Sequence, residues 1–117
     1  MTPSILAPYL ELPSRDLAAT KRFFHAVFGW QFTDYGDAYT AFDSNYNLGG
    51  FYLADKVSHT SSGACLIVLY SKHLESTRQK VIDSGGLISV DIFTFPGGRR
   101  FQFTEPGGSE LAVWTDQ

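Results

Sequence analysis

Carboxylates in strand-like surroundings are the first candidates for chemistry in this chain. Glu11 stands between Leu10 and Leu12, and Glu110 begins a second apolar stretch near a hairpin end. A carboxylate held among apolar side chains can act as a general base or bind a cationic group. Both residues also have a plain structural explanation. Glu11 could contact an arginine or a second copy of the chain, and Glu110 could be solvated.

The histidines and the single cysteine predict no catalytic or chelating set. His25 falls on the side of a predicted helix away from its apolar residues, His59 in a polar linker, and His73 at the start of a helix, where capping is its plain role. No two of them are spaced as a chelating pair. We expect Cys65 to be a buried and inert thiol, because Leu, Ile and Val follow it.

Composition excludes several partners. The 117 residues predict one domain, and 44% hydrophobic residues are enough for an ordinary core. A net charge of −3 without a basic stripe argues against nucleic acid and against an anionic membrane. Neither a membrane span nor a charged leader is expected, and a cytoplasmic location is the default. Arg99 and Arg100 follow a Gly-Gly turn, which predicts a solvated strand edge, although one of the two arginines could bind a ligand anion.

The elements that must position these groups follow from periodicity and turn signals. Asp16 predicts the start of a helix and Gly29 its left-handed stop. The predicted strands are 9–13, 30–34, 39–43, 48–54, 64–70, 87–95, 99–104 and 110–114, and the predicted helices are 17–28 and 74–84. A polar linker over 56–63 divides them into two halves, each in the order βαβββ.

The two halves align with each other. Leu17 matches Leu74 and Thr20 matches Thr77 at the same spacing, and residues 42–55 align without gaps on residues 103–116. The pattern predicts two modules, about 8–55 and 64–116, inside one domain of residues 1–117.

Three segments together resemble a known family. They are the helix string DLAATKRFFHAVFGW, the late turn TEPGGSELAVW and the spaced string LELP…RDL…FF…VFGW. The chain resembles the vicinal oxygen chelate superfamily, also called the glyoxalase/bleomycin-resistance/dioxygenase fold, and in particular its lactoylglutathione-lyase-related subgroup. The resemblance implies an α+β fold in which two tandem βαβββ modules form a curved mixed sheet around a ligand cavity, with helices on the outer faces. It also implies a homodimer.

The resemblance further implies four strand positions that hold a divalent metal in the family's enzymes. Counted from the helix cap and from the late turn, these positions are Tyr9, Phe51, Leu66 and Ala112. None offers an imidazole or a carboxylate. A slip of one residue would bring in only Cys65 as a ligand type, so no metal and no cofactor are expected.

The same faces predict a binding surface. If residues 105–108 close a hairpin, Phe101 pairs with Ala112. By the same register Phe103 pairs with Glu110. The predicted ligand-binding residues are Tyr9, Glu11, Phe51, Leu66, Phe101, Phe103, Glu110, Ala112 and Trp114. This aromatic and apolar lining suits a small aromatic or amphipathic ligand.

Three functions fit this lining. The first is a metal-independent small-molecule binding protein. The second is an enzyme, a glyoxalase-like lyase or isomerase that uses Glu11 as a base or an unrecognised divalent metal. The third is a ligand-sensing or purely structural dimer. Whether the chain is an enzyme stays open at this point, as does the pairing of the modules within one chain or between chains.

Overall fold

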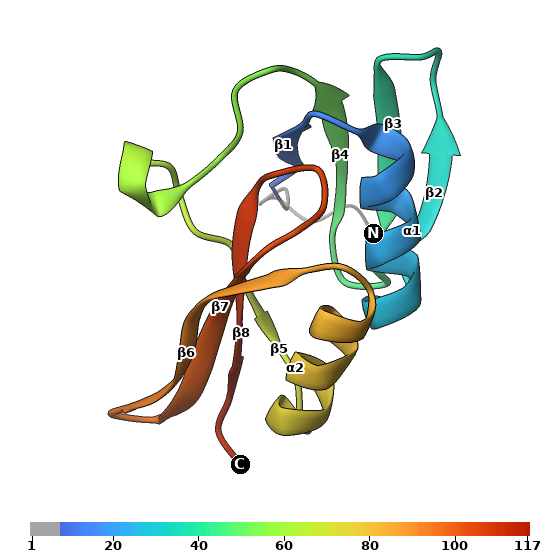
Figure 1. The fold of residues 1–117 in the computed structure, drawn as a ribbon. Coiled ribbons are helices and arrows are strands. Elements are labelled where there is room, and N and C mark those ends of the chain that lie inside the picture. The colour runs from blue at the N-terminus through green and yellow to red at the C-terminus, as the bar shows by residue number, and fades with distance from the viewer. Residues whose placement is uncertain (1–7) are drawn as a thin grey trace.

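The computed structural model describes residues 8–117, which form two similar modules (Figure 1). The first module contains β1 (Leu10–Ser14), α1 (Leu17–Phe28), β2 (Gln31–Asp34), β3 (Tyr39–Asp43) and β4 (Leu48–Leu53). The short helix η1 (Thr60–Ser62) lies in the connection. The second module contains β5 (Val68–Tyr70), α2 (Leu74–Asp83), β6 (Leu87–Phe95), β7 (Gly98–Thr104) and β8 (Glu110–Thr115). The α+β class and the order βαβββ in each module are confirmed.

Each module builds its own four-stranded mixed sheet. The first sheet has the order β1-β4-β3-β2 and the second has the order β5-β8-β7-β6. In both sheets the first strand pairs in parallel with the last strand of its module, and the other neighbours are antiparallel. The helix of each module supplies the crossover that a parallel pair requires.

Local signals define α1 as expected. The Asp16 side chain accepts a hydrogen bond from the Ala19 backbone N–H at 3.0 Å, which satisfies a free donor of the first turn. Gly29 ends the helix with φ 73°, a left-handed conformation that glycine adopts without strain. Phe23, Phe24 and other residues at helical spacing are buried along one side.

The core lies where α1 meets both sheets. Phe24 packs on Phe51 of β4, with ring centroids 5.3 Å apart, and Phe23 packs on Phe103 of β7 at 5.6 Å. Since α1 contacts the helix-facing side of each sheet, the opposite sides point away from each other. We call each of these the open face of its sheet. Within one chain, α1 therefore packs between the two sheets.

The connection between the modules is less regular than predicted. β5 begins at Val68 rather than at residue 64, and Cys65 is exposed before it rather than buried. The prediction for Cys65 was wrong because apolar neighbours bury a residue only where a strand or helix continues through it. Within residues 8–117, no helix has the length and apolar character needed to cross a membrane.

Candidate functional site

The open face of the first sheet carries a hydrogen-bonded cluster around Tyr39. The Tyr39 hydroxyl donates to Glu11 Oε2 at 2.9 Å and lies 2.8 Å from the Tyr9 hydroxyl. Gly50 permits this arrangement, because a Cβ there would overlap the Tyr39 ring. Burial, together with the hydrogen bonds to Tyr9 and Glu11, raises the pKa of Tyr39 well above its usual value. Tyr9 and Glu11 thus share a face, as predicted, and both are exposed.

Glu110 lies on the open face of the second sheet, where its carboxylate is fully engaged. It accepts from the backbone N–H and hydroxyl of Thr60 at 3.0 and 2.7 Å, from Ser89 Oγ at 2.7 Å and from Gln102 Nε2 at 3.2 Å. Burial alone would raise the pKa of Glu110, but these hydrogen bonds outweigh burial and lower the pKa to about 2. Glu110 therefore anchors the inter-module connection as a buried anion.

Ala112 and Trp114 share the open face with Glu110. Ala112 is fully buried and pairs with Val68 of β5, and Trp114 is half-buried. The Trp114 ring contacts Tyr70 edge-to-face, with centroids 5.2 Å apart. Leu66, which precedes β5, is half-buried. No hydrogen bond or aromatic contact among residues 8–117 joins this group to Tyr9 and Glu11.

Phe101 and Phe103 face the core instead of the open face. Phe103 pairs with Leu111, and Phe101 pairs with Val113. Both phenylalanines are fully buried in the core cluster. The predicted register was wrong by one residue because the turn between β7 and β8 spans residues 105–109, and such a slip moves every side chain to the other face.

Phe51 is misplaced by the same kind of error. Glu11 pairs with Gly50, and Val68 pairs with Ala112, so Gly50 is the residue of the first module that corresponds to Ala112. The spacing between these strands is 62 rather than the 61 used in the sequence alignment. Phe51 accordingly packs against α1 in the core, fully buried.

The four corrected positions do not fit a divalent metal. They are Tyr9, Gly50, Leu66 and Ala112, and they provide neither an imidazole nor a carboxylate. Over residues 8–117, no three His, Cys, Asp or Glu side chains gather as a possible metal site.

The histidines take local roles. The His25 Nδ1 atom lies 3.0 Å from the Trp30 carbonyl oxygen, and the His59 side chain accepts from the Ser61 backbone N–H. His73 precedes α2, but its side chain makes no capping hydrogen bond, so the predicted capping role was wrong.

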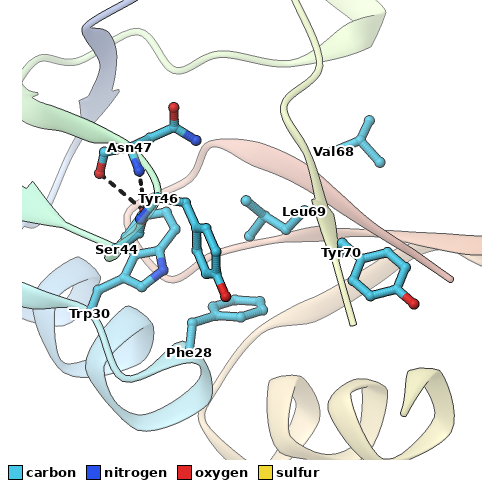
Figure 2. Close-up of a pocket in the computed structure, with 8 residues that line it drawn as sticks. All are labelled: Phe28, Trp30, Ser44, Tyr46, Asn47, Val68, Leu69 and Tyr70. Atoms are coloured by element: carbon cyan, nitrogen blue, oxygen red, sulfur yellow. Dashed lines mark hydrogen bonds between the residues drawn. The ribbon is translucent and has the colours of Figure 1, made fainter. Parts of the chain in front are cut away.

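A groove of about 440 Å³ lies between the modules (Figure 2). Figure 2 shows aromatic side chains from the end of α1 and from the β3–β4 turn on one wall and β5 on the other. The lining residues are Phe28, Trp30, Ser44, Tyr46, Asn47, Val68, Leu69 and Tyr70. Its volume and mostly apolar walls are those of a small-molecule site.

The last turns of the two modules make different contacts with the helices. In the second module, Glu105 in the β7–β8 turn accepts from the Thr20 hydroxyl of α1 at 2.9 Å. A hydroxyl pair, Ser14 with Thr20, lies beside it at 2.7 Å. The corresponding pair in the second module, Ser71 with Thr77, is also 2.7 Å apart, but no carboxylate among residues 8–117 contacts it. Among residues 8–117, the β3–β4 turn makes no hydrogen bond to α2 that corresponds to the Glu105 contact with α1.

None of the nine predicted site residues lines this groove. The sequence predicts that Phe28 ends a helix, that Trp30 starts a strand and that residues 44–47 form a turn. Their aromatic content is the only local signal. Their convergence on β5 depends on how the modules pack, which no periodicity in the sequence reveals.

Solved structures with the same fold come from several bacteria. A glyoxalase/bleomycin resistance protein/dioxygenase family enzyme from Burkholderia phytofirmans matches with a TM-score of 0.77 at 12% identity, over 93% of this chain and 97% of that chain. The fosfomycin resistance protein FosX from Mesorhizobium loti matches with 0.77 at 15% identity, over 99% and 95%. An integron cassette protein from V. cholerae matches with 0.67 at 21% identity, over 100% and 98%.

At these identities the structural likeness shows a shared fold alone. A comparison with the curated proteins gives no match. The family model of the Glyoxalase/Bleomycin resistance protein/Dioxygenase superfamily matches residues 6–113. Because this match spans nearly the whole chain, the protein belongs to the Glyoxalase/Bleomycin resistance protein/Dioxygenase superfamily.

Proposed function

We propose that this protein binds a small aromatic or amphipathic molecule without a metal ion. The observation that carries the proposal is the groove between the modules, whose aromatic wall consists of Phe28, Trp30 and Tyr46 and faces Leu69 of β5 (Figure 2). Aromatic side chains supply large contact areas and can stack on a flat ligand. Ser44 and Asn47 at the rim add polar groups that can orient it.

Metal independence is supported by the residues at the family's four ligand positions, since Tyr9, Gly50, Leu66 and Ala112 carry no imidazole or carboxylate. Of the other predicted site residues, Glu110 is better explained as a structural anchor, because its carboxylate is engaged by Thr60, Ser89 and Gln102.

An enzyme with Glu11 as general base is the alternative. Glu11 lies on the exposed face of the first sheet and already accepts a hydrogen bond from Tyr39, and it does not line the groove. We therefore favour binding over catalysis. The string from Leu10 to Trp30 supports membership of the lactoylglutathione-lyase-related subgroup, and the unpaired Cys65 is in keeping with the expected cytoplasmic location.

A thermal-shift screen of small aromatic compounds tests the binding function. Compounds that enter the groove should raise Tm by the same amount with chelator and with added divalent metal, because binding to the folded state alone stabilises it. Metal analysis of the purified protein is expected to find no stoichiometric ion. A tightly held divalent ion, or binding that requires one, would contradict metal independence.

Two variants locate the binding. Tyr46→Ala removes an aromatic side chain that is 92% exposed at the groove rim, so it should reduce the ligand-induced shift while leaving the unliganded Tm unchanged. Glu11→Gln is the matched control on a surface outside the groove, and it should retain the full shift. A reduced shift in Glu11→Gln together with a full shift in Tyr46→Ala would instead place the ligand on the open face of the first sheet.

We also propose that the protein forms a homodimer through its open faces. These faces expose large apolar side chains that a monomer would leave in water, namely Tyr9, Leu48 and Tyr52 on the first sheet and Val68, Tyr70 and Val90 on the second. The two open faces of one chain point apart, so in the dimer the first sheet of one copy would face the second sheet of the other, with contact at these exposed apolar side chains and space for a small ligand between the sheets.

Sedimentation equilibrium provides the test of this dimer. Tyr52→Glu places a charge in the proposed interface and should shift the protein towards monomer, because an unpaired charge is costly to bury. Tyr35→Glu changes an exposed tyrosine in the β2–β3 turn, outside the proposed interface, and is the control that should leave the dimer intact. A wild-type protein that sediments as a monomer at micromolar concentration would refute the proposal.

A further inference from the structure

Among the described residues, Arg100 is the arginine that lies on the open face of the second sheet. It pairs with Trp114 in β8, and Trp114 in turn pairs with Tyr70 in β5. On the other side, Phe93 of β6 pairs with Arg100. A row of Tyr70, Trp114, Arg100 and Phe93 therefore runs across this face.

The guanidinium of Arg100 is held in place by an aromatic ring. Its Cζ atom lies 5.1 Å from the centroid of the Phe93 ring, within range for a cation–π contact. Trp114 also contacts Phe95, with centroids 6.4 Å apart. The charge thus sits among flat apolar surfaces that exclude part of its water.

Arg100 has no counter-ion among the described residues. None of the ion pairs within residues 8–117 includes it, and its buried Nε atom has no hydrogen-bond partner there. The single hydrogen bond of this guanidinium is a long one, 3.4 Å from Nη2 to the Gln102 side-chain oxygen. In contrast, Arg78 and Arg99 are each paired with a carboxylate.

The carboxylates of Glu110, Asp91 and Asp116 already have other hydrogen-bond or ion-pair partners. Glu110 accepts from the amide nitrogen of Gln102, whose oxygen faces Arg100, so this amide separates the two charges. Asp91 pairs with Arg78, and Asp116 accepts from the Tyr70 hydroxyl. A half-buried cation without a partner is costly to maintain, which favours a site completed by an external anion.

We propose that Arg100 binds the carboxylate of a flat aromatic ligand whose ring lies on Trp114. A guanidinium presents paired N–H donors that match the two oxygens of a carboxylate, and the adjoining aromatic row offers the surface for the ring. This surface lies on the open face of the second sheet, outside the groove, so the inference goes beyond the proposed function: it adds a second binding surface, the charge of its ligand and the residue that recognises that charge.

Naphthoate and its neutral amide, naphthamide, are the probes for this site. Calorimetric titration of the wild-type protein is expected to show that naphthoate binds more tightly than naphthamide. Arg100→Gln should weaken naphthoate about tenfold or more and leave naphthamide nearly unchanged, because only the charged contact is lost. Arg99→Gln removes the same charge from the neighbouring position, where the side chain pairs with Glu75, and should leave both affinities unchanged.

Each other outcome overturns the inference in a distinguishable way. Equal binding of the two probes, unaffected by Arg100→Gln, would refute the anion site and leave the proposed function standing. Absence of saturable binding of either probe at millimolar concentration would refute the anion site, while the thermal-shift screen would still test the groove. Loss of the dimer in Arg100→Gln and Glu11→Gln alike, with naphthoate ineffective, would show that a second copy supplies the anion.

Stability gives a second readout that needs no probe. In buffer without organic anions, Arg100→Met is expected to raise Tm by a few degrees, because an apolar chain replaces an unpaired cation beside Phe93 and Trp114. A clear fall in Tm would identify Arg100 as a structural residue and overturn the assignment.

Discussion

Replacing Phe103 by alanine is expected to destabilise the protein by about 3–5 kcal/mol, the usual cost of deleting a large buried aromatic side chain. Phe103 is fully buried and contacts Phe23 and Phe28 of α1 at 5.6 and 6.2 Å between ring centroids. It belongs to the second module and packs on the helix of the first. The variant therefore weakens the joint between the modules as well as the core.

Urea denaturation measures the loss, as a lower midpoint at an unchanged m-value. Tyr46→Ala is the control, since this aromatic side chain is almost fully exposed, and its effect should stay within about 0.5 kcal/mol. If Phe103→Ala lowers the free energy of unfolding as little as the control does, Phe103 lies on the open face. The register expected from the sequence would then be correct.

Elements with local signals were predictable from the sequence. α1 has the predicted bounds because Asp16, which caps it, and Gly29, which ends it, directly flank the helix in the sequence. β3 and β6 also have their predicted bounds, since alternation and flanking turns define them. The two-module order follows from these elements and from the matching positions of the two halves.

Strand register was predictable only to within one residue. The turn after β7 contains five residues rather than four, and this single difference moves Phe101 and Phe103 from a ligand surface into the core. The alignment of the two halves is also off by one residue, so it matches Phe51 rather than Gly50 with Ala112. Register depends on cross-strand pairing, which adjacent residues do not determine.

The groove and the unpaired guanidinium depend on tertiary packing. Residues 44–47 and 105–109 are the equivalent last turns of the two modules, yet of these only residues 105–109 hydrogen-bond to a helix of the other module within the described chain. Arg99 and Arg100 are adjacent and chemically identical, yet one pairs with Glu75 and the other rests on Phe93. The sequence raised the possibility of an anion-binding arginine but could not choose between them.

Glu105 makes the stability of the protein depend on pH near neutrality. Its side chain is 2% exposed in the β7–β8 turn. Burial raises the pKa of Glu105 to about 7 from 4.5, although Thr20 and the Gly107 backbone N–H donate to the carboxylate and partly offset burial. The nearby charge of Asp16 raises the pKa further.

The sign of the dependence follows from proton binding. Between about pH 4.5 and 7 the folded protein holds a proton on Glu105 that the unfolded chain has lost. Stability is therefore full below about pH 4.5 and falls as the pH rises through 7. The shift from 4.5 to about 7 corresponds to roughly 3 kcal/mol of lost stability.

Glu105→Gln should abolish this dependence. The amide is neutral at every pH, and its oxygen can still accept from Gly107 while its nitrogen donates to Thr20. Urea denaturation of both proteins between pH 5 and 8 is expected to give a flatter profile for the variant, with the variant the more stable at pH 8. The difference between the two profiles isolates Glu105, because the carboxylates with lowered pKa values, such as Glu110, lose their protons below this range. A wild-type stability that holds level or rises from pH 5 to 8 would mean that Glu105 is ionised throughout, with Thr20 and Gly107 fully compensating its burial.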